Sequence, residues 1–417
     1  MRRLPLWIGK LIYVILRLLG KRGAALPGLV VEKISPGFLA DSLKQLPNGV
    51  VVVTGTNGKT TSTKMLTHVL CSKMKVLTNP TGSNFTRGVI ASIVQNSTWL
   101  GKLDYDIAVI ELDEAYAAKF SESYSPEYCL VLNVMRDQMD RFGEIDYTAK
   151  LISKVVEKTT KNIILNADDR RVSAMTTDTG ASIEYFGVSP KLRDLYRNDD
   201  ELHGGISDIK KHKLLAEMIS FNDRLLNIKL NGNIVSIPFN IEGTYNAQNA
   251  VAVIAMAFRL GISVEDITTC IETAKPAFGR GEVFIVNGKR LVLQLVKNPG
   301  GFRHSLLGGS KMGAKTTIIA INDDYADGRD VSWLWDVKFQ GFMSGDIYTS
   351  GTRASDMALR LGYDDIGVKH IASDLSEAVR QAIDGINPGE TLLVYATYTA
   401  MLETRKIIAK MTRVDKI

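Results

Sequence analysis

The stretch Val50-Val-Val-Val-Thr-Gly-Thr-Asn-Gly-Lys-Thr-Thr61 decides the fold of this chain. Its first half is a short run of β-branched apolar residues, which is typical of a buried strand. Residues 61–70 that follow are expected to form a helix. A strand, a glycine loop and a helix in this order predict a phosphate-binding loop, because the backbone N–H groups of such a loop and the helix N-terminus cradle anions.

The polar residues of this loop have expected roles in binding ATP. Lys59 would neutralise the β and γ phosphates, and Thr60 would ligate Mg²⁺. The complete eight-residue pattern has glycine at position 53, where this chain has Val53. The alternative is a glycine turn with a solvated lysine, but the flanking strand and helix favour a nucleotide site. The candidate nucleotide-binding residues of the loop are Gly55, Thr56, Asn57, Gly58, Lys59, Thr60 and Thr61.

Apolar runs alternate with helical segments along the whole chain, without an internal repeat. This alternation predicts an α/β fold with parallel strands and crossover helices. The expected strands are 50–54, 107–112, 129–134, 163–166, 290–296, 316–321, 346–349 and 391–395.

The length of 417 residues exceeds what one hydrophobic core usually holds, so two or three domains are expected. We assign residues 1–45 to an N-terminal helix and linker, 46–283 to a central ATP-binding domain and 284–417 to a C-terminal, Rossmann-like α/β domain. Residues 189–242 interrupt the pattern with polar sequence and short alternating runs at 225–230 and 234–239. They predict a small antiparallel insertion.

The net charge of +6 comes from the N-terminal arm. Six of the 51 basic residues precede the first acidic residue, Glu32, so the remaining 45 balance the 45 acidic residues. A neutral body argues against a broad nucleic-acid-binding surface. The six are Arg2, Arg3, Lys10, Arg17, Lys21 and Arg22.

Leu4 to Leu19 is apolar, but Lys10 and Arg17 interrupt it, so it is too short and too charged for a transmembrane helix. It also lacks the small-residue cleavage site of a signal peptide. On a helix its basic residues form one narrow stripe, as in helices that lie on anionic membranes. Packing on the next domain is equally open, and both readings can hold. Gly20, Gly23 and Pro27 are expected to end the helix.

The chain has three cysteines, Cys71, Cys129 and Cys270, with no paired spacing. They indicate neither a disulfide framework nor a zinc ribbon, and they fit the reducing cytoplasm. His203 and His212 alone cannot complete a tetrahedral site, so no zinc is expected.

The loop Gly55 to Thr61 resembles the ATP loop of Mur ligases and folylpolyglutamate synthases, which activate a carboxylate as an acyl phosphate that an amine displaces. The resemblance implies a Mur-type central ATPase domain followed by a Rossmann-like domain. It also implies ATP and Mg²⁺ as cofactors.

Further residues carry this resemblance in the same order along the chain. Glu111 resembles the second Mg²⁺ ligand, although an ordinary helix start at Glu111, Asp113 and Glu114 would look the same. Lys150, in Tyr147-Thr-Ala-Lys150, resembles a lysine that is carbamylated in many Mur ligases and then binds metal; a solvated helix lysine is the alternative.

Two more matches concern the nucleotide. Asn249 resembles the adenine-contacting residue of the family. Arg280, in Phe278-Gly-Arg-Gly-Glu282, resembles the arginine that reaches the γ phosphate, where it can stabilise charge that develops during transfer.

Two longer stretches narrow the resemblance. Residues 133–143 carry Gln138 where the amino-acid-adding ligases have a metal-binding histidine, which weakens the case for a two-metal site. Residues 321–336 likewise depart from the adding enzymes. Both stretches resemble the synthetase subunits of lipid II isoglutaminyl synthases, and the resemblance spans nearly the whole chain. It implies that Asp323 contacts the ribose.

The resemblance implies amidation of the D-glutamate α-carboxylate of the lipid II stem peptide, with ammonia from a separate glutaminase subunit of the GatD type. In that family an aspartate of the synthetase completes the partner's catalytic triad. Asp330 is our first candidate, followed by Asp327 and Asp336. Helix capping or local pairing is the alternative for these acids.

Two other functions stay open. One is a stand-alone ligase that adds an amino acid, which Gln138 and the stretch from Asp327 to Asp336 argue against. The other is a non-catalytic, nucleotide-binding membrane scaffold, which Lys59, Thr60, Glu111 and Arg280 together argue against. ATP consumption in the presence of substrate and partner would distinguish the enzymes from the scaffold.

Overall fold

The computed structural model describes residues 3–19, 25–79, 85–136, 144–202, 211–222, 224–241, 243–276 and 280–413, without the side chains of Leu202 and Arg280. The chain divides into two compact units. The first unit comprises residues 1–135, 144–240 and 246–274, and the second comprises 136–143, 241–245 and 275–417.

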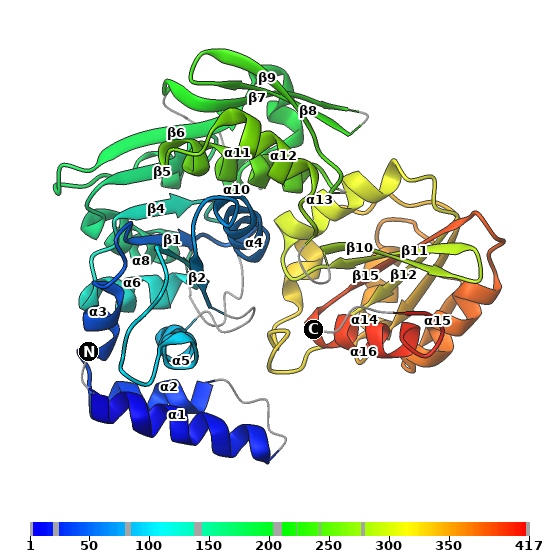
Figure 1. The fold of residues 1–417 in the computed structure, drawn as a ribbon. Coiled ribbons are helices and arrows are strands. Elements are labelled where there is room, and N and C mark those ends of the chain that lie inside the picture. The colour runs from blue at the N-terminus through cyan, green and yellow to red at the C-terminus, as the bar shows by residue number, and fades with distance from the viewer. Residues whose placement is uncertain are drawn as a thin grey trace. The chain divides into compact units, whose positions relative to one another are not determined.

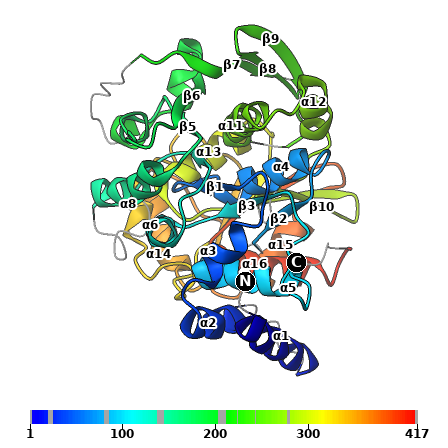
Figure 2. The ribbon, with the colours of Figure 1, turned by 60° about the vertical axis from the view of Figure 1, so that its left-hand side comes forward.

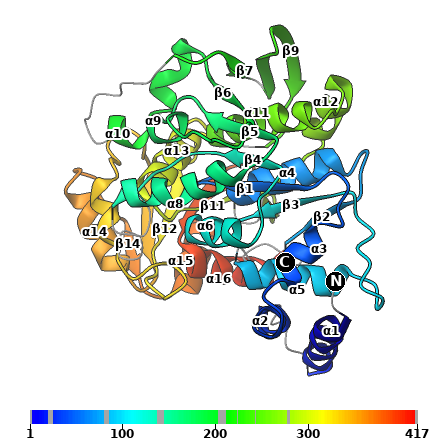
Figure 3. The ribbon, with the colours of Figure 1, turned by 90° about the vertical axis from the view of Figure 1, so that its left-hand side faces the viewer.

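Three helices precede the first strand: α1 (Arg3–Leu18), α2 (Ala25–Ile34) and α3 (Phe38–Leu43). Helices α1 and α2 lie side by side, and both contact α5 (Thr86–Asn96) (Figures 1 and 3). The expected helix from Leu4 to Leu19 is thus confirmed within one residue at each end. The expectation for Pro27 was wrong, because it lies in the first turn of α2, where a proline costs no hydrogen bond.

The sheet of the first unit has nine strands in the order β2-β3-β1-β4-β5-β6-β7-β8-β9. In this order, each neighbouring pair from β2 to β7 is parallel. Strands β8 and β9 add two antiparallel pairings at one edge. The bounds are β1 (Val50–Thr54), β2 (Val76–Thr78), β3 (Ile107–Glu111), β4 (Tyr128–Val131), β5 (Asn162–Asn166), β6 (Ser182–Val188), β7 (Leu214–Asn222), β8 (Leu225–Leu230) and β9 (Asn233–Pro238).

Helices cover both faces of this sheet. The connection from β1 to β2 runs in one direction along the sheet, and the connections from β2 through β3 and β4 to β5 run in the other. Because such crossovers are right-handed, α4 (Lys59–Leu70), which follows β1, lies on one face, and the helices between β2 and β5 lie on the opposite face. On the face opposite to α4, α6 (Glu114–Ser123) contacts α5 and α8 (Ile145–Lys158). Helix α4 contacts α12 (Val264–Glu272), which follows α11 (Thr244–Arg259).

The stretch 189–242 was expected to form a small antiparallel insertion. Strands β8 and β9 are antiparallel as expected, but they extend the main sheet through β7, which pairs in parallel with β6 (Figure 2). Short helical segments lie before and within this region: α9 (Arg170–Ser173), the 3₁₀ turn η1 (Pro190–Leu195) and α10 (Asp199–Leu202).

The second unit has a six-stranded sheet in the order β10-β11-β15-β12-β13-β14, parallel except for the β10–β11 pair. Two parallel-stranded sheets with crossover helices confirm the expected α/β class. Its strands are β10 (Arg280–Val286), β11 (Lys289–Leu295), β12 (Thr316–Ala320), β13 (Asp346–Ser350), β14 (His370–Ala372) and β15 (Thr391–Ala396). Its helices are α13 (Pro299–Ser310), η2 (Ser332–Asp336), α14 (Ala354–Gly362), α15 (Leu375–Asp384) and α16 (Tyr398–Ile408).

The strands at the centre of each sheet are buried on both faces. Val50, Val51, Val52 and Val53 have no exposed surface, which explains why β1 is apolar at every position instead of alternating. Among the described residues, no helix is both long and apolar enough to cross a membrane.

Candidate active site

The loop between β1 and α4 lies at the carboxyl end of β1, where parallel sheets of this kind bind ligands. Strand β1 lies between β3 and β4, so the residues that follow those two strands flank the loop. Three sequence segments therefore meet at one edge of the sheet, although 50 to 80 residues separate the loop from the other two.

Lys59 is the first residue of α4, and its side chain is buried. Its ammonium group donates hydrogen bonds to the backbone oxygens of Gly55 and Thr56, the latter at 3.2 Å, and lies 3.5 Å from Glu114 Oε2. The ammonium therefore folds back over the loop. Because these partners compensate a buried cation, incoming phosphate oxygens can replace them without leaving the charge unpaired.

Two glycines fix the shape of the loop. Gly58 has φ of 90°, and a Cβ atom built on it would lie 2.3 Å from Asn249 Oδ1. Gly55 has φ of 129°, and its Cβ atom would lie 2.9 Å from the backbone oxygen of Asn133. Only glycine combines these backbone angles with such close neighbours.

The segment after β4 holds the loop from the other side. Asn133 Oδ1 accepts a hydrogen bond of 2.8 Å from the backbone N–H of Asn57, and Asn133 Nδ2 donates one of 3.0 Å to the backbone oxygen of Asn57. The backbone N–H of Thr56 donates to the backbone oxygen of Asn133 at 2.9 Å. The backbone N–H of Met135 donates to Thr56 Oγ1 at 3.1 Å.

Asp169 holds the segment after β4 in place through hydrogen bonds to the backbone. Its Oδ2 accepts a hydrogen bond of 2.7 Å from the backbone N–H of Val134, and its Oδ1 caps α9 by accepting from the N–H groups of Arg171 and Val172. Complete burial raises the pKa of Asp169 to about 6 although these three donors lower it. Sequence reasoning missed Asp169; the signal was polar sequence, Asn-Ala-Asp-Asp169, directly after a buried strand.

A pair of oxygen ligands lies on the β3 side of the loop. Thr60 Oγ1 donates a hydrogen bond of 2.9 Å to Glu111 Oε1. Asn79, which sequence reasoning also missed, fixes the backbone of Glu111 with two hydrogen bonds of 2.9 Å. Asp113 and Glu114 are buried beside them.

A hydroxyl and a carboxylate held together in this way fit Mg²⁺, which takes few protein ligands and completes its shell with phosphate oxygens and water. Within the described part of the chain, no group of three or more His, Cys, Asp or Glu side chains forms a closed metal site. An ion bound by Thr60 and Glu111 would complete its coordination with phosphate oxygens or water.

Asn249 lies in α11, and its side chain is buried beside Gly58. Among the described residues, no acceptor contacts its Nδ2. An unpartnered buried amide is costly, and a nucleotide group would relieve that cost. This observation fits the role that the sequence suggested for Asn249.

The remaining expected residues of the ATP site are less informative. Lys150 lies on α8 with an exposed side chain. The Gln138 segment, residues 137–143, lies outside the described residues, as does the side chain of Arg280.

In the second unit, polar residues gather at the carboxyl ends of β12, β13 and β15. Asn322 receives hydrogen bonds from the backbone N–H of Thr352 and donates to Thr399 Oγ1 at 3.0 Å. Asp323 accepts from Thr352 Oγ1 at 2.7 Å and pairs with Arg353 at 2.8 Å. These two partners, the hydroxyl first, lower the pKa of Asp323. A half-buried, ionised carboxylate at this edge fits a ligand with hydroxyl groups.

The three candidate triad acids differ in their surroundings. Asp327 is buried and accepts from the N–H and the hydroxyl of Thr399 at 2.7 and 2.5 Å. Asp330 is exposed, and hydrogen bonding from Ser332 lowers its pKa. Asp336 is exposed at the end of η2. Asp327 is thus engaged within the unit, whereas Asp330 and Asp336 face outward.

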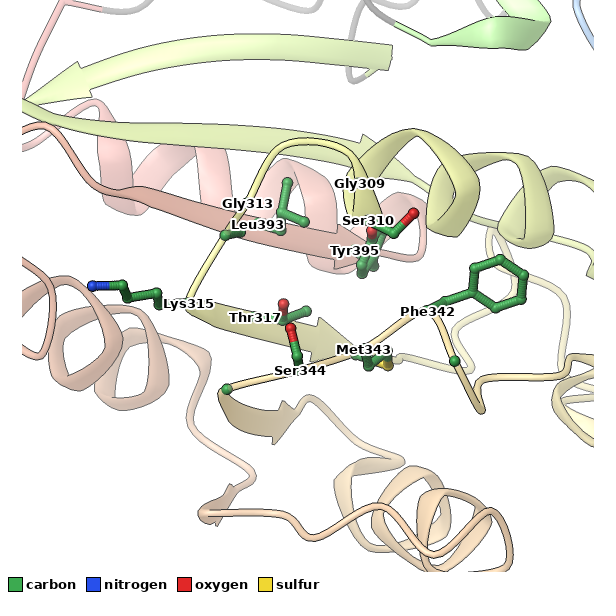
Figure 4. A pocket seen from close by; sticks show the side chains of 13 residues that line it. Gly309, Ser310, Gly313, Lys315, Thr317, Phe342, Met343, Ser344, Leu393 and Tyr395 are labelled. Carbon is green, nitrogen blue, oxygen red and sulfur yellow. The ribbon is translucent and has the colours of Figure 1, made fainter.

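A pocket of about 340 Å³ also lies in the second unit (Figure 4). It is bordered by Gly309, Lys315, Thr317, Ser344 and Tyr395, at the amino ends of β12 and β13. Parallel sheets of this kind bind ligands at their carboxyl ends, and this pocket lies at the other end of the strands from Asp323.

Comparison with known proteins agrees with this geometry. Residues 53–257 match the Mur ligase middle domain, and residues 295–401 match the MurT ligase C-terminal domain. Two relatives are lipid II isoglutaminyl synthase (glutamine-hydrolyzing) subunits MurT. The Staphylococcus aureus protein is 31% identical over 93% of this chain and 94% of its own length. The Streptococcus pneumoniae protein is 30% identical over 99% and 98%.

Solved structures show the same fold at low identity. MurF from Acinetobacter baumannii has a TM-score of 0.69 at 19% identity and covers 93% of this chain and 80% of its own. MurF from Thermotoga maritima, in complex with ADP, has a TM-score of 0.69 at 14% identity and covers 89% and 82%. With both domain matches in order and two near full-length relatives, the chain belongs to the Mur ligase family, and within it to the MurT group.

Proposed function

We propose that this protein is the ATP-dependent synthetase subunit of a lipid II isoglutaminyl synthase. It would convert the α-carboxylate of D-glutamate in the lipid II stem peptide into a primary amide. The observation that carries the proposal is the near full-length match to two MurT subunits. It is supported by the loop after β1, where Lys59 bonds the backbone of Gly55 and Thr60 bonds Glu111.

The proposed reaction has two steps. A carboxylate oxygen attacks the γ phosphorus of ATP, ADP leaves, and an acyl phosphate forms. Ammonia then attacks the acyl carbon, inorganic phosphate leaves, and the nitrogen loses a proton to give the amide. Little covalent chemistry falls to the protein in phosphoryl transfer, so positioning and charge stabilisation dominate.

The residues divide this work. Lys59 and the backbone N–H groups of the first turn of α4 hold the β and γ phosphates, and Asn249 binds the nucleotide beside Gly58. Arg280 stabilises the charge on the transferred group, and Asp323 binds the ribose. Mg²⁺, held by Thr60 and Glu111, would neutralise phosphate charge, and a carbamylated Lys150 is a further candidate ligand.

Ammonia comes from a partner glutaminase of the GatD type in this proposal, because none of the three cysteines lies in a recognisable nucleophile turn. Cys129 has no exposed surface, and burial raises the pKa of its thiol to about 12. Burial also raises the pKa of Cys71. A catalytic thiol needs the opposite shift.

Asp330 completes the partner's triad in this proposal. It is exposed and its pKa is lowered, so it can reach another subunit as a carboxylate. Asp327 is the weakest of the three candidates because Thr399 occupies both of its oxygens. The substrate carries a lipid tail, and we place the complex at the inner face of the cell membrane.

The test is an amidation assay. The chain is co-purified with its glutaminase and incubated with lipid II, ATP, Mg²⁺ and glutamine, and the product is analysed by mass spectrometry. Conversion of the acid to the amide should lower the mass by about 1 Da, and ammonium salts should replace glutamine when the partner is left out. Incorporation of a free amino acid instead would identify a stand-alone ligase, and absence of ATP consumption would identify a scaffold.

A further inference from the structure

The outward face of α1 is apolar along its whole length. At 100° per residue, Leu4, Trp7, Leu11, Val14, Ile15 and Leu18 fall within an arc of about 100°, and all six side chains are exposed. Leu11 is 59% and Leu18 is 82% exposed. The opposite side of α1 packs on the first unit through Leu6 and Gly9, and Gly9 lies directly against Val31 and Val94.

A turn from another part of the sequence extends this face. The segment 97–103 connects α5 to β3 and is closed by a bridge between Ser97 and Leu103. Its tip carries Trp99 and Leu100, which are 60% and 73% exposed. Trp7 Nε1 donates a hydrogen bond of 2.8 Å to the backbone oxygen of Trp99, so the turn is fastened to α1.

The charges along α1 have one sign. Arg3 and Arg17 are exposed and border the apolar arc along one side. Lys10, on the same stripe, lies under the turn with its ammonium 5.4 Å from the centre of the Trp99 ring. No acidic residue occurs in the first 31 positions of the sequence. Binding to an anionic surface favours an excess of basic residues, whereas binding to a protein partner of mixed charge does not.

We infer that α1 and the 97–103 turn form one docking surface for an anionic lipid bilayer. The apolar arc, with Trp7 and Trp99, enters the interface between headgroups and acyl chains, and Arg3 and Arg17 contact lipid phosphates. Because the turn belongs to the ATP-binding unit, binding through both elements would hold that unit at a fixed depth. A helix joined to the unit only by a flexible linker would not fix that depth. The inference extends the membrane contact proposed above and does not depend on which group is amidated.

Vesicle flotation with the full-length chain tests the inference without lipid II or ATP, so its result is independent of the amidation assay. The chain should float with vesicles of phosphatidylcholine and phosphatidylglycerol at 7:3, and much less with pure phosphatidylcholine. Arg3→Gln with Arg17→Gln should weaken binding to anionic vesicles several-fold, and salt should weaken the wild type similarly. The exposed pair Lys213→Gln with Lys229→Gln is the matched control.

Apolar variants test the two elements separately. Leu11→Ser with Leu18→Ser should lower the partition coefficient at least tenfold, and Leu100→Ser alone should lower it several-fold. Ile234→Ser and Leu359→Ser, equally exposed elsewhere, should have no effect. Thermal melting should be unchanged for all of them because each side chain is exposed.

Three results would overturn the inference. The first is that the wild-type protein does not float with anionic vesicles. The second is that Leu100→Ser binds as well as the wild type, which would mean that α1 acts without the turn. A wild-type dimer that Leu11→Ser with Leu18→Ser dissociates, without vesicle binding, would assign the face to a second copy of the chain.

Discussion

Thr60 Oγ1 donates a hydrogen bond of 2.9 Å to Glu111 Oε1 and so joins the first turn of α4 to the end of β3. Register explains the meeting, because Val53 of β1 lies opposite Glu111 of β3 in the parallel ladder. The loop begins at Gly55, two residues after Val53, and must therefore pass the carboxylate.

Glu111→Gln should raise the Mg²⁺ concentration needed for half-maximal ATP consumption by at least tenfold. The amide keeps the shape of the side chain and can still accept from Thr60, but it removes the charge that binds the cation. A Mg²⁺ titration of ATP consumption measures the effect. Glu122→Gln, exposed on α6, is the control, and an unchanged Mg²⁺ requirement in Glu111→Gln would exclude Glu111 as a ligand.

Lys59→Ala should lower the rate of amide formation by about 100- to 1000-fold or more, because the phosphates lose their neutralising cation. The comparison is Lys64→Ala, an exposed lysine one and a half turns further along the same helix. Equal rates in the two variants would contradict the role of Lys59.

Gly58→Ala should abolish ATP binding, whereas Gly232→Ala should not. Both glycines have φ near 90°, so each alanine should cost about 1 to 2 kcal/mol of folding free energy. Only the Cβ atom at position 58 has a neighbour, Asn249 Oδ1 at 2.3 Å, whereas nothing lies within 4 Å at position 232. Calorimetric ATP titration with urea unfolding separates the two effects, and ATP binding by Gly58→Ala would disprove the tight fit.

Asp330→Asn should lower glutamine-dependent amidation on the order of 100-fold and leave ammonium-dependent amidation within about twofold, as loss of an orienting carboxylate would. Asp336→Asn should leave both rates unchanged. A loss of both activities in Asp330→Asn would show that the residue serves the synthetase site and not the partner.

Asp168 and Asp169 should contribute more to the stability of the protein at pH 5 than at pH 7. Burial raises the pKa of each carboxyl to about 6 from 3.8, so the folded chain binds protons that the unfolded chain has released. Their contribution is complete below pH 3.8 and is lost as the pH rises through 6, by ~1 to 3 kcal/mol for each group. Urea unfolding across this range measures it. His304, whose pKa is lowered to about 4 by desolvation, acts in the opposite direction over this range, so the wild type is compared with Asp168→Asn and Asp169→Asn. The same pH dependence in the wild type and in both variants would contradict the assignment.

The sequence was sufficient for the elements that have a strong local signal. The predicted strand 50–54 and the predicted run 225–230 agree with β1 and β8 at both ends. Uninterrupted β-branched residues, or strict alternation, leave few other structures open to such segments. The class of the fold followed from their order.

The missed elements lack such a local signal. Strand β7 includes Glu217 and Ser220 on a partly exposed face, so its sequence is weakly patterned, and it exists because β6 and β8 both pair with it. Asn79, Asn133 and Asp169 were missed for a related reason. Each acts on a residue at least 30 positions away, and only the order of strands in the sheet reveals that proximity.

The fate of one oxygen atom tests the central claim, which is ATP-dependent activation of a carboxylate followed by capture with ammonia. Lipid II with ¹⁸O in the glutamate α-carboxylate is incubated with the complex, ATP, Mg²⁺ and glutamine, and the released phosphate is analysed by mass spectrometry. One ¹⁸O in each phosphate and one phosphate for each amide are expected. Unlabelled phosphate, or AMP in place of ADP, would contradict the claim, because no acyl phosphate of this carboxylate would then have formed.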